Sequence, residues 1–503
     1  MILRDEKPVQ VRLESVTKQP FLTGFPRTVV ATAKRRLQAA IRTQRATLQR
    51  DSLCGYALMF ARFLPASFLA QIDPTPRHRH FGHLPVFWAW LAQILETNAS
   101  CAKAVSLIQA WSRAAGLTVP SSQTGGYCQA RGRIQLGFLA AIHQRIRAML
   151  DWSVRPCDLW HGHVVKAIDG STVQLLDTPP NQEFYPQPEG QTPGCGFPTM
   201  GVVGVLNLAH GGWEGFETCP HTAHDAAIAP RLLKHVEAND ILLGDRAFCS
   251  YELIARLRQQ EAHAVMRLHQ ARHAKLDWRK GGKLSPIERL VTWQKPRYQP
   301  AGSTLSAEGW KALPETLTLR YIRLGYEDRG GNKRMLVVVT TLLDPAKYDA
   351  HEVAELYARR WHIELKLRDL KTTLGMERFD VRTPEMAHGT LWMMMIACNL
   401  LRGLMQQAAI EADKPIAGMS FKGIMDHAVA SRESYLKHRD KPRRLVAHHA
   451  RVVETLATKV IDPRPGRREP RALKRRPKNY PLLTSPRAEF HDTPHRGRPR
   501  SGR

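Results

Sequence analysis

Apolar residues in the middle of the chain recur with two different periods. Short runs of β-branched and aliphatic residues follow Trp160 and are typical of buried strands. Two stretches with helical spacing, 225–236 and 250–260, lie between these runs. A mixed sheet with helices packed on it is the economical arrangement, so the pattern predicts an α/β fold. The strands are expected at 164–168, 173–176, 200–208, 241–243 and 264–268.

Helical spacing dominates on both sides of this region. Between His83 and about Leu150 the apolar residues fall on helix faces, which predicts a helical region before the sheet. After the sheet, a long helix is expected from Asp349, which suits an N-cap, to Gly375, which suits a helix end. More helix is expected from residue 384 to about 412.

A polar, lysine-rich section separates the last core strand from the helix that begins at Asp349. Its second half predicts two strands, 317–324 and 335–341, joined by a glycine-containing turn that suits a hairpin. We interpret this section as a β-rich insertion.

The chain then has six segments: a basic N-terminal region with a candidate DNA-binding role at 1–80, a helical domain with candidate DNA contacts at 81–155, an α/β core at 160–269 and 345–385, the insertion at 270–344, a C-terminal helical region at 386–460 and a basic Pro/Arg-rich tail at 461–503.

The charge of the chain indicates what kind of partner the protein binds. The chain has 503 residues and a formal net charge of +29. A charge of this size attracts a polyanion, and nucleic acid is the first candidate. The tail from Ile461 contains 13 Lys/Arg against 4 Asp/Glu, so most of the excess lies on the rest of the protein. The alternative is a chain whose basic faces are merely solvated.

Cysteine usage and hydropathy exclude several classes of protein. Eight scattered cysteines include no C-x-x-C pair, which excludes the usual zinc clamps and favours a reducing cytoplasm. The N-terminus has no apolar signal core. The most apolar stretch, 391–405, is interrupted by Asn399 and Arg402 and is shorter than the roughly 20 residues of a membrane span. We therefore expect a buried helix there and no membrane partner.

Two aspartates follow runs that predict strands. Asp169 comes directly after the apolar run at 164–168, and Asp245 comes directly after Ile241-Leu-Leu-Gly. Buried strands hold their side chains rigidly, so aspartates on neighbouring strands can share a divalent cation. Aspartate also caps helices and starts turns, so either residue alone is weak evidence of a site.

One stripe of the helix expected from Asp349 carries a more specific pattern. At about 100° per residue, Arg360, Glu364 and Lys371 lie at roughly 300°, 340° and 320° from Tyr357. The four side chains would share one narrow stripe beside a separate apolar face. A tyrosine and two cations beside Glu364 suit a carboxylate that faces a metal ion and a phosphate together. The alternative is a solvated, charged helix face.

These residues resemble those of the DDE transposases of bacterial insertion sequences, specifically the insertion-sequence-four family. The resemblance runs from about His83 to the C-terminus. It implies a ribonuclease H-like catalytic core with a β insertion before the helix that carries Glu364. It rests on Asp169-Gly-Ser-Thr, Gly244-Asp245-Arg-Ala-Phe and the complete Tyr357/Arg360/Glu364/Lys371 signature. One subgroup of the family is similar also in Asp177-Thr-Pro-Pro-Asn, Tyr185-Pro-Gln-Pro, Gly194-Cys-Gly-Phe-Pro and the basic tail from Pro465.

The resemblance assigns roles residue by residue. Asp169, Asp245 and Glu364 become the catalytic, metal-binding triad, which would use two Mg²⁺ ions per site, replaceable by Mn²⁺. The other signature residues become contacts to DNA. Arg131 and Arg133 are further candidates because they follow a polar insert with Ser/Thr caps, although they would equally suit a solvated helix. The full set of candidate DNA contacts is Tyr357, Arg360, Lys371, Arg246, Arg131 and Arg133.

The implied function is cut-and-paste transposition. The enzyme would cleave double-stranded DNA at the terminal inverted repeats of its element and transfer the freed 3′-OH to target DNA. It would act as a homodimer or a larger synaptic complex on DNA, at the nucleoid in the bacterial cytoplasm. The alternatives are a nuclease on the same fold that does not join DNA, and a basic DNA-binding protein with an inactive site.

The sequence departs from some relatives in one place. Those relatives carry a tryptophan at the start of the insertion strand, where it stacks on a flipped base beside a DNA hairpin. The corresponding stretch here, from Arg334 to Val337, contains no aromatic residue. Met335 would have to wedge a base step there, or a tryptophan would have to approach from elsewhere, the candidates being Trp278, Trp293 and Trp310.

Overall fold

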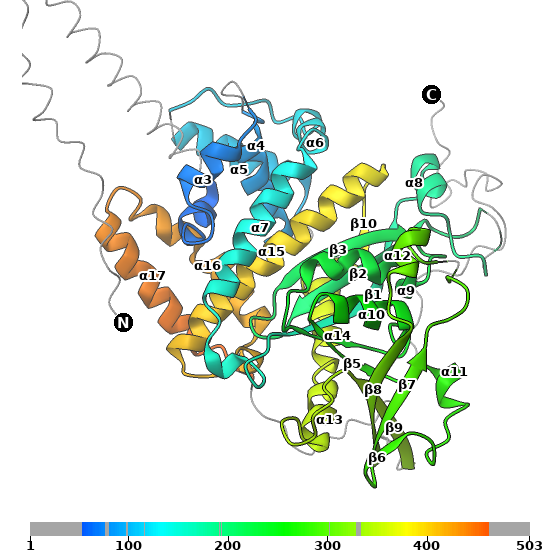
Figure 1. Cartoon of the computed structure of the whole chain (residues 1–503). Coiled ribbons are helices and arrows are strands. Elements are labelled where there is room, and N and C mark those ends of the chain that lie inside the picture. Colours follow the sequence, from blue (N-terminus) through cyan, green and yellow to red (C-terminus); the bar gives the residue numbers. More distant parts are fainter. Residues whose placement is uncertain are drawn as a thin grey trace, which may run out of the picture. The chain divides into compact units, whose positions relative to one another are not determined.

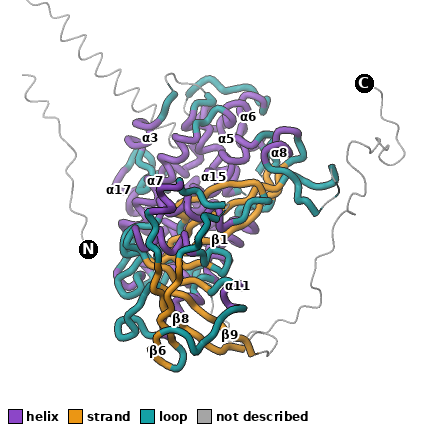
Figure 2. The backbone as a smooth tube through the Cα atoms, turned by 45° about the vertical axis from the view of Figure 1, so that its right-hand side comes forward, coloured by secondary structure: helices purple, strands orange, loops and turns teal. Residues whose placement is uncertain are grey.

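The computed structural model describes residues 53–75, 80–96, 99–114, 116–190, 192, 194–300, 302–327 and 333–461. The basic stretch before residue 53, the turn at 328–332 and the tail after Ile461, on which several predictions fall, lie outside the described residues. Figures 1 and 2 show the strands side by side, with helices packed against them.

The strands of the described residues form one sheet in the order β3-β2-β1-β4-β5-β9-β8-β7-β6, with β10 paired to β1. β2 is antiparallel to both β1 and β3, whereas β4 and β5 run parallel to β1. This is the ribonuclease H-like arrangement, so the predicted fold class is confirmed. The strands are β1 (Val165–Leu175), β2 (Thr199–Asn207), β3 (Trp213–Pro220), β4 (Ile241–Gly244), β5 (His263–Arg267), β6 (Gly282–Ser285), β7 (Glu288–Gln294), β8 (Thr316–Glu327), β9 (Lys333–Thr340) and β10 (Arg378–Phe379).

Two strand predictions need correction. The runs at 164–168 and 173–176 are a single strand, because the Gly170-Ser-Thr segment between them stays paired to β2 along its whole length. Asp169 therefore lies inside a strand rather than at its end. Strand β3 was not predicted from its mixed polar and apolar residues, and in the structure it pairs antiparallel with β2.

The insertion extends the core sheet. Its strand β9 pairs antiparallel with β5, with Val265 opposite Thr340, and β8, β7 and β6 follow outward. The predicted hairpin is the β8–β9 pair. Figure 2 shows these strands at the end of the molecule opposite α3 to α6. The core sheet and the insertion thus share one continuous hydrogen-bonded surface.

The helical region before the sheet agrees with the predicted periodicity. Its helix α4 is buried along almost its whole length, because it packs against α5, α6 and α15. The helices of this region are α2 (Tyr56–Met59), α3 (Ala66–Ile72), α4 (His83–Leu95), α5 (Cys101–Ala114), α6 (Gly125–Gly132) and α7 (Leu136–Trp152). The helices between the strands are α8 (Pro179–Phe184), α9 (Asp225–Ile228), α10 (Tyr251–Gln259), α11 (Gln270–His273) and α12 (Ala307–Lys311).

The helix predicted at 225–236 is shorter than expected. Regular α-helix ends after one turn, and a 3-10 helix, Ala229–His235, takes over. Pro230 has no N–H to continue the α-helical hydrogen bonds, which explains the change. Further 3-10 turns occur at Leu53–Gly55, Pro156–Asp158 and Ile416–Gly418.

The long helix expected from Asp349 to Gly375 is interrupted. Asp349 does cap its start, accepting hydrogen bonds from two backbone N–H groups, and Gly375 ends it with φ of 82°. Between them lie α13 (Ala350–Ala358), α14 (Trp361–Arg368) and a π-helical turn (Asp369–Thr373). The tight hydrogen bonds at the first break and the wide π turn both depart from about 100° per residue, so the predicted single stripe is not maintained.

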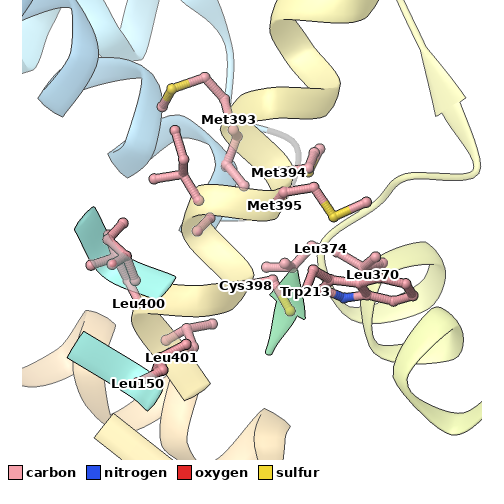
Figure 3. Packing of buried hydrophobic residues seen from close by; sticks show 14 of the residues in the cluster. Leu150, Trp213, Leu370, Leu374, Met393, Met394, Met395, Cys398, Leu400 and Leu401 are labelled. Atoms are coloured by element: carbon pink, nitrogen blue, oxygen red, sulfur yellow. The ribbon is translucent and has the colours of Figure 1, made fainter. Parts of the chain in front are cut away.

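The apolar stretch at 391–405 is the buried centre of α15 (Pro384–Glu411), as predicted. This helix packs against α7, α4, β3, α16 (Phe421–Leu436) and α17 (Pro442–Ala457), and its methionine and leucine side chains point to several of these neighbours (Figure 3). Among the described helices, none has the combination of length and apolar character that crossing a membrane requires.

The two polar residues that interrupt this stretch connect α15 to the sheet and to the segment that follows α14. Asn399 accepts a hydrogen bond from the Trp213 N–H (2.8 Å) and donates one to the Trp213 carbonyl (2.9 Å) at the start of β3. The fully buried Arg402 pairs with Asp369 (2.5 Å) and lies over the Phe421 ring. Asn399 thus ties α15 to β3, and Arg402 ties it to the π-helical turn that follows α14.

The buried His143 of α7 predicts a dependence of stability on pH. Its Nε2 lies 3.2 Å from the Asn399 amide, and burial lowers its pKa from 6.5 to about 4. The unfolded chain therefore binds a proton between these values that the folded protein does not. We expect the free energy of unfolding to fall as pH decreases from about 6.5 to 4, by about 3 kcal/mol from this residue.

Urea unfolding between pH 4 and 7 measures this effect. His143→Gln removes the titrating group and should lose less stability over the same range than the parent protein does. Equal pH slopes for the two proteins would show that His143 does not titrate as the structure implies.

Candidate active site

The strand register brings Asp169 and Asp245 together. Strands β1 and β4 are parallel, with Ala167 opposite Leu243, so the next two residues along each strand bring the aspartates to equivalent positions. Asp169 Oδ1 accepts a hydrogen bond from the Gly170 N–H (2.9 Å). Asp245 directly follows β4, and its Oδ1 accepts one from the Ala247 N–H (2.7 Å). Both carboxylates are thus held by neighbouring backbone.

Arg360 connects this pair of strands to Glu364. Its Nη1 lies 3.6 Å from Asp169 Oδ2, and its Nη2 donates a hydrogen bond to Glu364 Oε1 at 2.8 Å. The guanidinium is half-buried and lies between carboxylates from β1 and α14. The structure therefore brings Arg360 together with two of the predicted triad residues.

The charges of the three carboxylates act on one another. Burial raises the pKa of Asp169 to about 6, and the charges of Asp245 and Glu364 raise it as well, against the lowering effects of the Gly170 N–H and Arg360. Three neighbouring carboxylates, two of which share the Arg360 guanidinium, suit a divalent cation, whose charge would remove the repulsion between them. The residues present therefore fit such an ion.

Tyr357 lies next to Arg360, and Lys371 follows later, in the π-helical turn. Tyr357 is buried at the end of α13, and burial raises the pKa of its phenol against the opposing effects of Arg360 and Arg267. Lys371 lies in the π-helical turn, where burial lowers its pKa and the charge of Glu377 raises it. The structure thus places the first and last residues of the predicted stripe in different surroundings.

The remaining candidate DNA contacts differ in their availability. Arg246 and Arg133 are exposed. Arg131 is partly buried, with its guanidinium 4.6 Å from the centre of the Trp90 ring and 3.4 Å from Gln93 Oε1. Packing within the helical region thus already engages Arg131, while the other two arginines are open to solvent.

The three tryptophans that were candidates for base stacking already pack against other side chains of the protein. Trp293 and Trp310 are buried in the apolar cluster of the insertion, and the Trp278 ring lies under Arg289 and Arg323. Met335 is exposed on β9. Of the candidates from the sequence, Met335 is therefore the side chain open to solvent.

A fourth carboxylate near the site was missed by sequence reasoning. Asp225 begins α9, and one of its oxygens lies 2.0 Å from the position that a Cβ on Gly170 would occupy. Burial raises the pKa of Asp225, and the nearby charge of Asp245 raises it further. The visible signal was the glycine directly after Asp169, which permits this close approach.

A second group of acidic and histidine side chains, Asp151, His210 and Glu214, lies close enough together to suggest a metal site. The Gly212 N–H donates to His210 Nδ1 (3.0 Å), so Nε2 carries the hydrogen that faces Asp151 Oδ1 (3.1 Å). Glu214 is paired with Arg147 at 3.2 Å. A histidine that donates from Nε2 cannot ligate a metal through that atom. We therefore interpret this group as a buried ion network.

Known proteins are similar to this chain in the region of these residues. Residues 160–400 match the family model described as a transposase DDE domain. The chain is 25% identical over 259 residues to the transposase InsG of insertion sequence element IS4 from Escherichia coli K12, which covers 51% of this chain and 55% of that protein. It is 30% identical over 104 residues to the putative transposase InsZ of the same organism, covering 20% of this chain and 35% of that one.

Among solved structures, the piggyBac transposase in a synaptic complex with hairpin DNA aligns with a TM-score of 0.41 and 11% sequence identity, covering 81% of this chain and 86% of that one. The chain spans about half the length of InsG and about a third of InsZ. The matched region 160–400 includes Asp169, Asp245 and Glu364. The resemblance predicted from the sequence is thus confirmed at the level of the domain: residues 160–400 match a transposase DDE domain, and the chain is similar to the transposase of insertion sequence element IS4.

Proposed function

We propose that this protein is a transposase that cuts DNA at the ends of its element and joins the freed ends to target DNA. The observation that carries the proposal lies within the DDE domain: the charges of Asp245 and Glu364 both act on Asp169, and Arg360 pairs with Asp169 and Glu364. Water displaces the 3′ oxygen from the phosphorus, leaving a 3′-OH and a 5′ phosphate. The 3′-OH then displaces an oxygen from a target phosphorus in the same way.

The three carboxylates would hold divalent cations, with Mg²⁺ as the physiological ion and Mn²⁺ as a substitute. When bound, two such ions would activate the attacking oxygen and stabilise the leaving one. The protein's own contribution is to hold the carboxylates rigidly on β1, β4 and α14. Asp169 must be deprotonated for this role, which the charge of a cation favours.

Tyr357 is proposed as a DNA contact rather than a nucleophile. Burial raises the pKa of its phenol, so the side chain stays neutral near pH 7. A covalent protein–DNA intermediate would require an activated phenolate. Arg360, beside Tyr357, would neutralise negative charge where carboxylates and phosphate meet.

The proposed partner is double-stranded DNA, both the terminal inverted repeats of the element and the target. The net charge of +29 supports this partner. Pairing two DNA ends calls for a homodimer or a larger synaptic complex. We expect the protein to act at the bacterial nucleoid in the cytoplasm, where this DNA lies.

Arg246 and Lys371 are expected to contribute to DNA affinity through phosphate charge. Each substitution, Arg246→Gln and Lys371→Gln, should reduce the slope of log affinity against log salt by about 1, because one fewer counterion is released. Fluorescence anisotropy with end DNA at several salt concentrations measures the slope. Lys422→Gln, which removes a surface cation already paired with Asp426, is the matched control and should leave it unchanged. Slopes equal to that of the parent would remove these two residues from the DNA interface.

A joining assay separates the proposal from the alternatives. Purified protein is incubated in Mg²⁺ with labelled end DNA and a supercoiled plasmid. A transposase yields labelled plasmid, a nuclease yields cut ends without joined product, and an inactive DNA-binding protein yields neither.

A further inference from the structure

The Asp225 carboxylate approaches Gly170 very closely. A Cβ on Gly170 would lie 2.0 Å from Asp225 Oδ2, 2.5 Å from its Cγ and 2.9 Å from its Oδ1. Atoms that are not bonded cannot come so close, so any side chain at 170 would displace this carboxylate. Because Gly170 directly follows Asp169, the Asp225 carboxylate lies against the backbone of the catalytic strand β1.

Asp225 has no partner that would explain this position. Across the described ranges, no hydrogen bond or ion pair involves its carboxylate, which is only partly exposed. The charge of Asp245 acts on it unfavourably, and His221 and His224 partly compensate. Bringing a carboxylate out of water beside another carboxylate costs free energy unless a positive charge offsets it.

A cavity adjoins the residues next to Asp225. The two residues that follow it on α9, Ala226 and Ala227, line a cavity of about 410 Å³. Ala247, two residues after Asp245, lines the same cavity. This cavity therefore lies between the chain neighbours of Asp225 and of Asp245.

We infer that Asp225 is a fourth carboxylate of the divalent-cation site, and that glycine at position 170 is what admits it. The inference rests on the proposed function, because it assigns the cation to Asp169, Asp245 and Glu364. Asp225 joins this site from α9, a different element, and supplies the negative charge on the side that faces Gly170. The added oxygen donor increases the affinity of the site for Mg²⁺ or Mn²⁺.

Cation binding to the DNA-free full-length protein tests the inference without an activity assay. Electron paramagnetic resonance measures the free Mn²⁺ that remains at each protein concentration. Asp225→Asn keeps the shape of the side chain and removes its charge, and it should weaken Mn²⁺ binding about tenfold or more. Asp426→Asn, which removes an exposed aspartate of α16, is the matched control and should bind as the parent does.

Variants at Gly170 provide a second test in the same Mn²⁺-binding experiment. Gly170→Ala should weaken Mn²⁺ binding by displacing the Asp225 carboxylate, and it should also lower the melting temperature. The Gly170→Ala/Asp225→Ala double variant removes the clash, so it should regain part of the melting temperature while Mn²⁺ binding remains weak. If Gly170→Ala binds Mn²⁺ as the parent does, the inference is wrong.

Asp169→Asn distinguishes failure of the inference from failure of the proposed function. If Asp169→Asn weakens Mn²⁺ binding and Asp225→Asn does not, the site has three carboxylates and the inference is wrong. If neither change affects Mn²⁺ binding, the cation site itself is misplaced and both proposals fail. Weakening by both substitutions supports the four-carboxylate site.

Discussion

Asp169→Asn is expected to lower the rate of DNA end cleavage in Mg²⁺ by at least about 10³-fold, because a cation contributes several kcal/mol to the transition state. The substitution keeps the size of the side chain and its place within β1, so the fold and DNA binding should persist. Initial cleavage rates on labelled end DNA measure the first effect, and anisotropy measures binding. The same loss is expected for Asp245→Asn and Glu364→Gln.

Asp151→Asn is the informative control for this experiment. It alters the other acidic group in the structure, the Asp151–His210–Glu214 network, which we interpret as structural. This variant should cleave within a few-fold of the parental rate. Near-parental cleavage by Asp169→Asn, or a loss of cleavage confined to Asp151→Asn, would move the metal site to the second group.

Arg320→Met is expected to destabilise the protein by about 3 to 5 kcal/mol, because it leaves Glu288 buried without its partner. Arg320 of β8 is fully buried, pairs with Glu288 of β7 through Nε (2.8 Å), and donates to the Tyr348 carbonyl (2.6 Å). Because Tyr348 lies just before α13, Arg320 joins the insertion to the segment that leads into this helix. Urea unfolding measures the loss.

Two further variants establish that the loss comes from an unpaired buried charge. Lys422→Met breaks the exposed Lys422–Asp426 pair and should change stability by less than about 1 kcal/mol. Arg320→Met/Glu288→Met replaces both charges with apolar groups and should regain much of the loss. A double variant as unstable as Arg320→Met alone would attribute the effect to packing instead.

Features of the fold that depend on local sequence were predictable. Asp349 and Ser250 cap their helices through hydrogen bonds to backbone only two or three residues away. Gly375 ends a helix through its own φ angle. The buried strands follow from short apolar runs, since burial on both faces requires such runs.

Features that depend on pairing between distant segments were not predictable. The continuity of β1 through Gly170-Ser-Thr exists because β2 pairs with it, and β9 joins the sheet by pairing with β5. The break after α13 likewise has no proline or glycine to mark it in the sequence. A regular helix was therefore the natural but incorrect expectation.

The candidate site likewise contains residues that the sequence predicts and one that it does not. Asp169 and Asp245 were found because each follows an apolar run, and Glu364 because of its spacing from Tyr357 and Arg360. Asp225 was not found, since its contact with Gly170 depends on how α9 packs against the sheet. Sequence alone shows it only as the first residue of a short helix.

Mg²⁺-dependent cleavage at the element ends tests the central claim most directly. The parent protein is incubated with a DNA fragment that carries the terminal inverted repeat, in Mg²⁺ and separately in EDTA, and the broken ends are mapped at nucleotide resolution. We predict breaks at the element boundary in Mg²⁺ alone, with a 3′-OH on the cut strand. Cleavage that persists in EDTA, or a protein covalently attached to the DNA end, would contradict a metal-dependent centre built from Asp169, Asp245 and Glu364.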